Sequence, residues 1–194
     1  MLRKLVVGPY QANCYILGDQ QTKTGVVIDP GDEVLRILKE ISKNDLKIIY
    51  ILITHGHIDH IGGSVELKKL TKAPLFIHTL DTPGLNFRPD GYLYDGQKIH
   101  FGSYSISVIH TPGHSPGGVS FYSPGVIFTG DTLFAGSIGR TDFPGGDYNK
   151  LIEGVVTKIF PLGDDVRVYP GHGPATTIGR ERLTNPFFTA SRTF

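Results

Sequence analysis

The stretch THGHIDHIGG, residues 54–63, places three histidines and one aspartate within six positions, namely His55, His57, Asp59 and His60. The chain has only eight histidines, so the pattern H-x-H-x-D-H would arise by chance in roughly one sequence in a thousand of this composition. Imidazole and carboxylate groups without thiolates are typical of zinc, iron or manganese sites. The competing interpretation is that Asp59 caps a helix and the histidines are exposed. The pattern favours a metal site.

Three further motifs, in which a glycine precedes a histidine or an aspartate, supply additional candidate ligands. They are TPGHSPGG around His114, FTGDTLF around Asp131 and YPGHGP around His172. Together with the first cluster they make seven protein ligands, which is too many for one tetrahedral ion. Two divalent metal ions fit this ligand count if a carboxylate bridges them and a shared water completes both shells. Zinc is the first expectation, with iron or manganese as alternatives.

The candidate ligands follow predicted β-strands. Short runs rich in β-branched and aromatic residues predict strands over residues 5–8, 13–17, 25–29, 48–53, 75–78, 104–110, 118–122, 126–130 and 166–170. Apolar residues at helical spacing predict helices over residues 32–43 and 147–160, and a third from about residue 60 to residue 70. In open α/β sheets, sites form outside the carboxyl ends of the strands. We therefore expect these separate stretches to converge there.

The length and composition indicate one ordinary globular domain, residues 1–194. The formal net charge is +1, so the chain has no broad cationic field that would hold nucleic acid or an anionic membrane. No run of 18 apolar residues predicts a membrane span, and the apolar run near the N-terminus is too short for a signal peptide. We therefore expect a cytoplasmic protein with neither a nucleic-acid nor a membrane partner.

Taken in order, VVIDPGD around Asp29 and the four motifs above resemble the metallo-β-lactamase superfamily over nearly the whole chain. The resemblance implies an α+β fold of the αββα type, with two mixed β-sheets packed face to face and helices outside. It also implies a division of the ligands: His55, His57 and His114 would hold one metal, Asp59, His60 and His172 would hold the second, and Asp131 would bridge them. Asp29 would lie behind the ligands and orient the histidine loop.

A finer resemblance is to the glyoxalase II group, the hydroxyacylglutathione hydrolases. It is carried by GDTLFAGSIGRTDFPGG at residues 130–146, by GPYQANCYIL and by RLTNPFF. It implies hydrolysis of a small-molecule thioester, such as S-lactoylglutathione, by a metal-bridging hydroxide. Only 22 residues follow His172, so the chain resembles the short, single-domain branch. We expect no C-terminal helical domain of the kind that helps the long form to hold glutathione.

Two residues receive a specific role in that reaction. Asp59 is our candidate for orienting the hydroxide and accepting its proton. The resemblance implies that Arg140, in SIGRTDF, contacts a carboxylate of the thiol carrier, and the alternative is a surface arginine paired with Asp142. Covalent catalysis by serine has no supporting motif, since the sequence contains no G-x-S-x-G.

Other functions remain open at this stage. A persulfide dioxygenase shares the fold and a GRTDF-like stretch but uses a single iron, so metal content and oxygen consumption distinguish it from a hydrolase. The substrate could also be another small ester or thioester. Nothing beyond the shared metal motifs indicates a β-lactamase, and a non-catalytic binding module would be expected to have lost ligands.

Overall fold

Short apolar runs of the sequence form two six-stranded sheets in the computed structural model, which describes residues 1–189. The strands are β1 (Leu2–Val7), β2 (Ala12–Asp19), β3 (Thr24–Ile28), β4 (Lys47–Leu52), β5 (Leu75–His78), β6 (Gly91–Leu93), β7 (Lys98–Phe101), β8 (Tyr104–His110), β9 (Val119–Ser123), β10 (Val126–Gly130), β11 (Leu133–Phe134), β12 (Ser137–Ile138), β13 (Arg167–Pro170) and β14 (Thr176–Thr177). The first sheet has the order β1-β2-β3-β4-β5-β6 and the second the order β14-β13-β10-β9-β8-β7. Strands β11 and β12 form a separate hairpin.

Both large sheets are mixed. In the first sheet, β1, β2 and β3 pair antiparallel, whereas β3, β4, β5 and β6 pair parallel. In the second sheet, only β10 and β13 pair parallel. All eight residues of β2 are buried, as expected for a strand covered on both faces.

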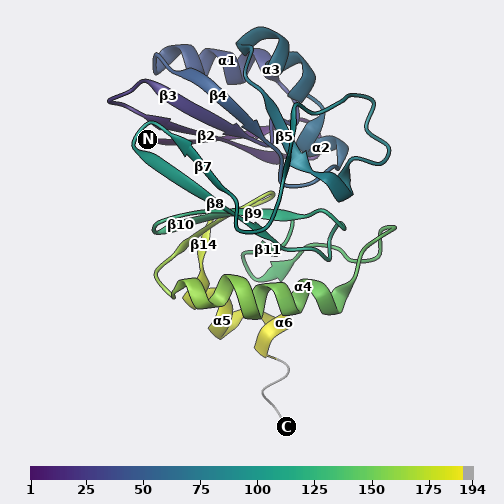
Figure 1. Cartoon of the computed structure of the whole chain (residues 1–194). Coiled ribbons are helices and arrows are strands. Elements are labelled where there is room, and N and C mark those ends of the chain that lie inside the picture. Colours follow the sequence, from purple (N-terminus) through teal and green to yellow (C-terminus); the bar gives the residue numbers. More distant parts are fainter. Residues whose placement is uncertain (190–194) are drawn as a thin grey trace.

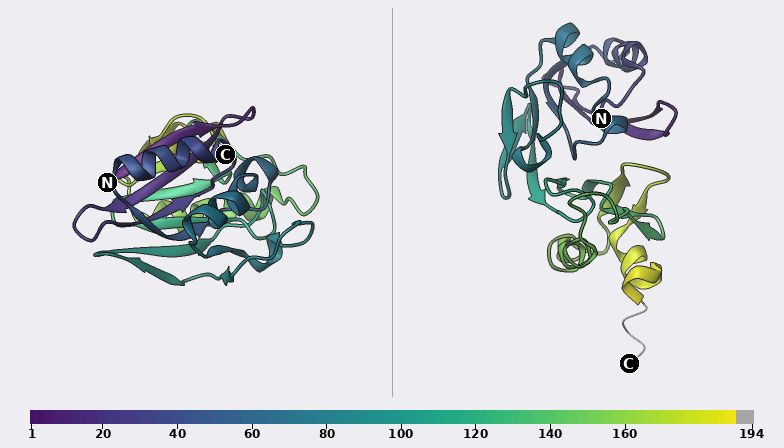
Figure 2. Two further views of the ribbon diagram at one scale, coloured as in Figure 1. Left: turned by 90° about the horizontal axis from the view of Figure 1, so that it is seen from above. Right: turned by 90° about the vertical axis from the view of Figure 1, so that its right-hand side faces the viewer.

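Helices cover the outer face of each sheet. They are α1 (Val34–Lys43), α2 (Ile58–Ile61), α3 (Ser64–Thr71), α4 (Tyr148–Gly154), α5 (Ile178–Thr184) and α6 (Pro186–Thr189), with further helical segments η1 (Thr79–Asp81), η2 (Val155–Ile159) and η3 (Phe160–Leu162). Helices α1 and α3 lie on one outer side, and α4, α5 and α6 lie on the opposite side, with the two sheets between them (Figures 1 and 2). The expected αββα fold class is therefore confirmed.

Three apolar clusters correspond to the three interfaces between these layers. Ile37 of α1 and Leu67 of α3 belong to the cluster against the first sheet. Tyr15 of β2 meets Phe128 of β10 between the sheets, with ring centroids 5.0 Å apart in an edge-on arrangement. Leu151 of α4 belongs to the cluster under the second sheet. Burial on both faces fixes the sheets relative to each other, and thereby fixes the loops at their edges.

The predicted helix over residues 60–70 differs from the observed structure. It forms two helices, α2 and α3, which are separated by Gly62 and Gly63. The backbone N–H of Gly63 donates to the Pro30 carbonyl at 2.9 Å, and a Cβ atom at Gly63 would lie 2.7 Å from that oxygen. The close approach of the chain after β3 therefore interrupts the helix. The helix predicted over residues 147–160 is observed as α4 continued by η2 and η3.

Among residues 1–189, no helix combines the length and the apolar character that a membrane span requires. Strands β6, β7, β11, β12 and β14 and helices α5 and α6 are not among the predicted elements. The last five residues of the expected domain, 190–194, lie outside the described residues.

Candidate metal centre

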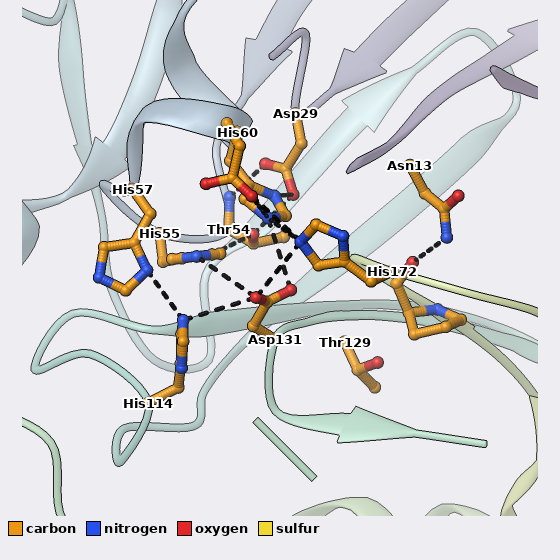
Figure 3. A network of polar contacts seen from close by, with 12 residues as sticks. Asn13, Asp29, Thr54, His55, His57, His60, His114, Thr129, Asp131 and His172 are labelled. Carbon is orange, nitrogen blue, oxygen red and sulfur yellow. Dashed lines mark hydrogen bonds and ion pairs between the residues drawn. The ribbon is translucent and has the colours of Figure 1, made fainter. Parts of the chain in front are cut away.

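Five strand ends bring Asp29 and the candidate ligands together at one edge of the sandwich, and Figure 3 shows the resulting cluster from close by. Strand β3 leads to Asp29, and β4 leads to the 54–57 loop and α2. Strands β8, β10 and β13 of the second sheet lead to the other three motifs, and all three run in the same direction. The structure gathers all seven candidate ligands in this one place: His55, His57, Asp59, His60, His114, Asp131 and His172.

The first group of donors consists of three histidines. One ring nitrogen of each of His55, His57 and His114 lies within 4.8 Å of the others. His114 Nε2 is 2.9 Å from His57 Nδ1. His55 and His114 are buried, whereas His57 is partly open to solvent. Three converging imidazoles of this kind are a typical zinc-binding set.

The second group combines a carboxylate with two histidines. His172 Nε2 is 3.1 Å from Asp59 Oδ2 and 3.3 Å from His60 Nε2. Asp59 lies in the first turn of α2 and makes no side-chain capping bond there, so the helix-cap interpretation of this residue is wrong. Its side chain faces the histidines instead.

The carboxylate of Asp131 lies between the two groups. Its Oδ2 is 3.5 Å from His114 Nε2 of the first group and 3.6 Å from His172 Nε2 of the second. Its Oδ1 is 3.4 Å from His60 Nε2. Asp131 is thus the one candidate ligand whose oxygens face histidines of both groups.

Hydrogen bonds behind the site fix how three of the histidines point. His60 Nδ1 bonds to Asp29 Oδ2 at 2.9 Å, and His114 Nδ1 bonds to the backbone carbonyl of Arg140 at 2.7 Å. His55 Nδ1 is 3.0 Å from Thr54 Oγ1, which donates to Asp29 Oδ2 at 2.6 Å. With each Nδ1 acting as the donor, each Nε2 points into the interior of the site and offers a lone pair there when it carries no proton.

Asp29 achieves this position at the end of β3 through an unusual backbone conformation. Its φ angle is +51°, in the left-handed region that aspartate tolerates better than most residues. Besides His60 and Thr54 Oγ1, it accepts the backbone N–H of Thr54 at 2.7 Å. Asp29 therefore lies behind the ligands and fixes the start of the histidine loop.

The electrostatics of the site reflect the crowding of its ionisable groups. Burial lowers the pKa of His60, but the carboxylates of Asp131 and Asp29 outweigh burial and raise this pKa to about 9. Burial raises the pKa of Asp59, but the hydrogen bond from His172 and the charge of His60 outweigh it and hold this pKa at about 2. Burial, followed by the charge of His60, lowers the pKa of His55. The carboxylates thus attract positive charge, and the buried His55 stays neutral.

Two buried atoms test whether the residues present fit a metal. His55 Nε2 and Asp131 Oδ1 are buried and have no hydrogen-bond partner within residues 1–189. Buried polar groups nearly always have a partner, so both atoms need an explanation. Both atoms face into the grouped donors, where a divalent cation would satisfy them. The donor set of imidazole and carboxylate groups therefore fits zinc, iron or manganese.

Two residues that no sequence motif indicates hold the His172 loop. Asn13 Nδ2 donates to the carbonyls of Pro170 and Gly173 at 2.9 and 3.0 Å, and the Tyr15 hydroxyl donates to Pro170 at 2.7 Å. Both side chains come from β2, which lies in the other sheet. The only signal in the sequence is the polar Asn13 inside an apolar strand.

Arg140 is exposed and pairs with Asp142. Its guanidinium contacts both carboxylate oxygens, at 3.0 and 2.7 Å, and lies 4.2 Å from the ring centroid of Phe143. The Phe143 ring in turn lies 5.3 Å from that of His57. The guanidinium is therefore near the first group of donors but already has a carboxylate partner.

A pocket of about 270 Å³ adjoins the second group of donors. The loop between β1 and β2 forms one wall, with Pro9 and Tyr10, and α2 forms another, with Ile58 and Asp59. Tyr10 and Ile58 are each 68% exposed. Asp59 belongs both to the lining of this pocket and to the second donor group, so the pocket lies next to the candidate metal centre.

Comparison with known proteins agrees with this geometry. Residues 7–172 match the family described as the metallo-beta-lactamase superfamily. The chain is 37% identical to the Haemophilus influenzae protein named hydroxyacylglutathione hydrolase GloC, over 95% of this chain and 96% of that protein.

Solved structures share the fold. The BLEG-1 B3 metallo-beta-lactamase is 38% identical, with a TM-score of 0.88 over 97% of this chain and 100% of that chain. ETHE1 from Myxococcus xanthus is 31% identical, with a TM-score of 0.88 over 96% of this chain and 83% of that chain. TTHA1623 in a di-iron-bound form is 37% identical, with a TM-score of 0.83 over 95% of this chain and 99% of that chain. The match over most of the chain confirms the resemblance, and this chain belongs to the metallo-beta-lactamase superfamily.

Proposed function

We propose that this protein is a dinuclear metal-dependent hydrolase that cleaves a small thioester such as S-lactoylglutathione. The observation that carries the proposal is the complete set of seven donors, which comprises two groups of three with Asp131 between them. The likeness to hydroxyacylglutathione hydrolase GloC, over nearly the full length of both chains, supports the choice of a thioester.

Each residue has a definite task in this proposal. His55, His57 and His114 would hold one divalent ion, Asp59, His60 and His172 would hold the other, and Asp131 would be the ligand that the two ions share. When bound, the ions would supply Lewis acidity, which polarises a carbonyl group and lowers the pKa of water to about 7. Asp29 and Thr54 keep the histidine lone pairs aimed inward.

Asp59 is the proposed proton acceptor. Its Oδ2 lies 3.1 Å from His172 Nε2, and the carboxylate would accept a hydrogen bond, and then the proton, from an attacking water. The leaving thiolate has a conjugate-acid pKa of about 8.5 for a simple thiol, so it departs without strong acid assistance. The pocket beside Asp59, with Pro9, Tyr10 and Ile58, offers apolar surface to the part of the substrate next to the thioester carbonyl.

Metal analysis of the purified protein, together with a thioester-hydrolysis assay, tests this proposal. We expect about two metal ions per chain, as in dinuclear hydrolases. Chelation is expected to abolish hydrolysis of S-lactoylglutathione, and zinc, iron or manganese is expected to restore it. A reproducible content of one iron with oxygen uptake on a persulfide would contradict the proposal in favour of a dioxygenase. Hydrolysis of a β-lactam but of no thioester would be consistent with the proposed metal centre and would contradict the proposed thioester substrate.

Arg140 provides a separate test of the thiol carrier. If its guanidinium exchanges Asp142 for a carboxylate of the carrier, Arg140→Ala is expected to lower kcat/KM for S-lactoylglutathione about tenfold, or about 1.4 kcal/mol. The expected loss of kcat/KM lies at the low end of the range for a hydrogen bond to a charged group, because Asp142 competes with the carrier for the Arg140 guanidinium. The loss should appear in KM, since the contact is remote from the breaking C–S bond.

The control substrate is a small thioester that lacks the carrier carboxylates, on which Arg140→Ala should have no effect. The control variant is Arg180→Ala, which removes an exposed arginine from α5. Equal losses on both thioesters, or no loss on S-lactoylglutathione, would exclude the carboxylate contact.

A further inference from the structure

A buried carboxylate outside the seven donors contacts the loops that carry the first group. Asp81 is the last residue of η1, the turn that follows β5, and it is 7% exposed. Its Oδ2 accepts the backbone N–H of Gly56 at 3.0 Å and the hydroxyl of Ser115 at 2.7 Å. Its Oδ1 accepts the backbone N–H of Gly117 at 2.5 Å. Neither sequence motifs nor the proposed reaction uses this residue.

All three donors to Asp81 belong to the two loops that present His57 and His114. Gly56 lies between His55 and His57, and Ser115 directly follows His114. These loops come from different sheets, since one follows β4 and the other follows β8. A single carboxylate therefore ties together two loops whose histidine nitrogens, His57 Nδ1 and His114 Nε2, lie 2.9 Å apart.

Gly56 and Gly117 permit this contact because they have no side chain. A Cβ atom at Gly117 would lie 2.7 Å from both the backbone nitrogen and the Oδ1 of Asp81. A Cβ atom at Gly56 would lie 2.7 Å from the Asp81 carbonyl oxygen. Real Cβ atoms essentially never approach so closely, so each loop reaches the turn only because a glycine stands there.

A stacked pair of histidines braces the same turn. His78 Nδ1 accepts the backbone N–H of Leu80, which caps the turn that ends in Asp81. The His78 ring stacks on His110, with centroids 4.4 Å apart and planes 7° from parallel. His110 Nε2 lies 3.0 Å from the Pro116 carbonyl, in the loop after His114. The turn is thus held in place relative to that loop on two sides.

Asp29 offers a comparison on the other side of the site, because it contacts His60 of the second group directly. No hydrogen bond of Asp81 within residues 1–189 goes to a residue of the second group. We propose that Asp81 is a positioning residue that sets the separation of His57 and His114 and thereby the affinity of the first metal site, separately from the second. This inference rests on the proposed function only in requiring that the two donor groups bind metal.

The substitution Asp81→Asn tests the proposal with little change of shape. Each Asp81 oxygen accepts a backbone N–H, so either orientation of the asparagine amide sets its NH₂ group against a donor. We expect the affinity of the first site to fall about 10- to 100-fold, the usual effect of losing a group that orients ligands, and that of the second to stay unchanged. The measurement is a competitive titration with Co²⁺, in which His57→Ala and His172→Ala identify the absorption of each site.

Asp90→Asn is the matched control. Asp90 also accepts a backbone N–H at the sheet, from Leu75 at 2.8 Å, but it pairs with Lys68 and touches neither histidine loop. It should leave both affinities and both Co²⁺ spectra unchanged. A milder second variant is Ser115→Ala, which removes one donor to Asp81 and should weaken only the first site.

Unchanged affinity of the first site in folded Asp81→Asn would overturn the proposal. Equal weakening of both sites would also overturn it, because that result indicates a general loss of structure. If Asp81→Asn does not fold, the same two outcomes in Ser115→Ala decide the matter. Wild-type protein that binds two ions but hydrolyses no thioester would refute the proposed substrate and leave this measurement valid.

Discussion

Replacing Asp131 with alanine is expected to lower the occupancy of both metal sites and to reduce thioester hydrolysis by at least about a thousandfold. The reason is its position between the two groups, with oxygens 3.5 Å from His114 Nε2 and 3.4 Å from His60 Nε2. No other candidate ligand among residues 1–189 faces histidines of both groups in this way. Metal content and steady-state kinetics of the purified variant measure both effects.

Two further variants make the Asp131 result interpretable. Asp131→Asn keeps the shape of the side chain and removes its charge, so it should lose metal even if the alanine variant folds poorly. Asp165→Ala removes an exposed aspartate from the turn before β13 and should leave metal content and rate unchanged. An Asp131→Ala protein that keeps two ions and full activity would remove Asp131 from the site.

The fold could be predicted from the sequence to the extent that its elements carry their own apolar pattern. The strand pattern over residues 104–110 and 126–130 matches β8 and β10 residue for residue. Strands β11, β12 and β14 have two residues each, so they carry no periodic signal in the sequence. They form only because the fold places their pairing partners beside them. The interruption between α2 and α3 at Gly62 and Gly63 depends on the close approach of the backbone of residues 30–31, which no local sequence pattern predicts.

The candidate site divides in the same way. Its ligands could be predicted because histidine and aspartate at these spacings are rare by chance, and strand ends converge. The supporting groups could not, because they act across large sequence separations on backbone atoms. Asn13 holds the carbonyl of Pro170, and His114 is held by the backbone carbonyl of Arg140 rather than by its side chain. Such contacts depend on the folded backbone and leave no motif.

The second large expected effect is at Gly171, where an added methyl group should disturb the site although no ligand is removed. A Cβ atom at Gly171 would overlap Asp131 Oδ1 and would lie 2.7 Å from His60 Cε1 and 3.0 Å from the carbonyl carbon of Gly130. The backbone cannot easily withdraw, because the N–H of Gly171 donates to the Gly130 carbonyl and its carbonyl accepts from Asn13, each at 2.7 Å. The methyl group must therefore displace the Asp131 carboxylate or the His60 ring.

We accordingly expect Gly171→Ala to lower the affinity for metal at both sites and to cut thioester hydrolysis by about a hundredfold or more, since small displacements of reacting groups carry costs of that order. The matched control is Gly154→Ala in α4, where the nearest atom to the added Cβ is 3.9 Å away and the helical backbone suits alanine. The control should be active and at least as stable as wild type. Metal titration and circular dichroism of both variants distinguish a displaced carboxylate from a misfolded chain. If Gly171→Ala binds metal with the affinity of the wild type, metal binding does not depend on the present position of the Asp131 carboxylate. That result would contradict the assignment of Asp131 as the bridge.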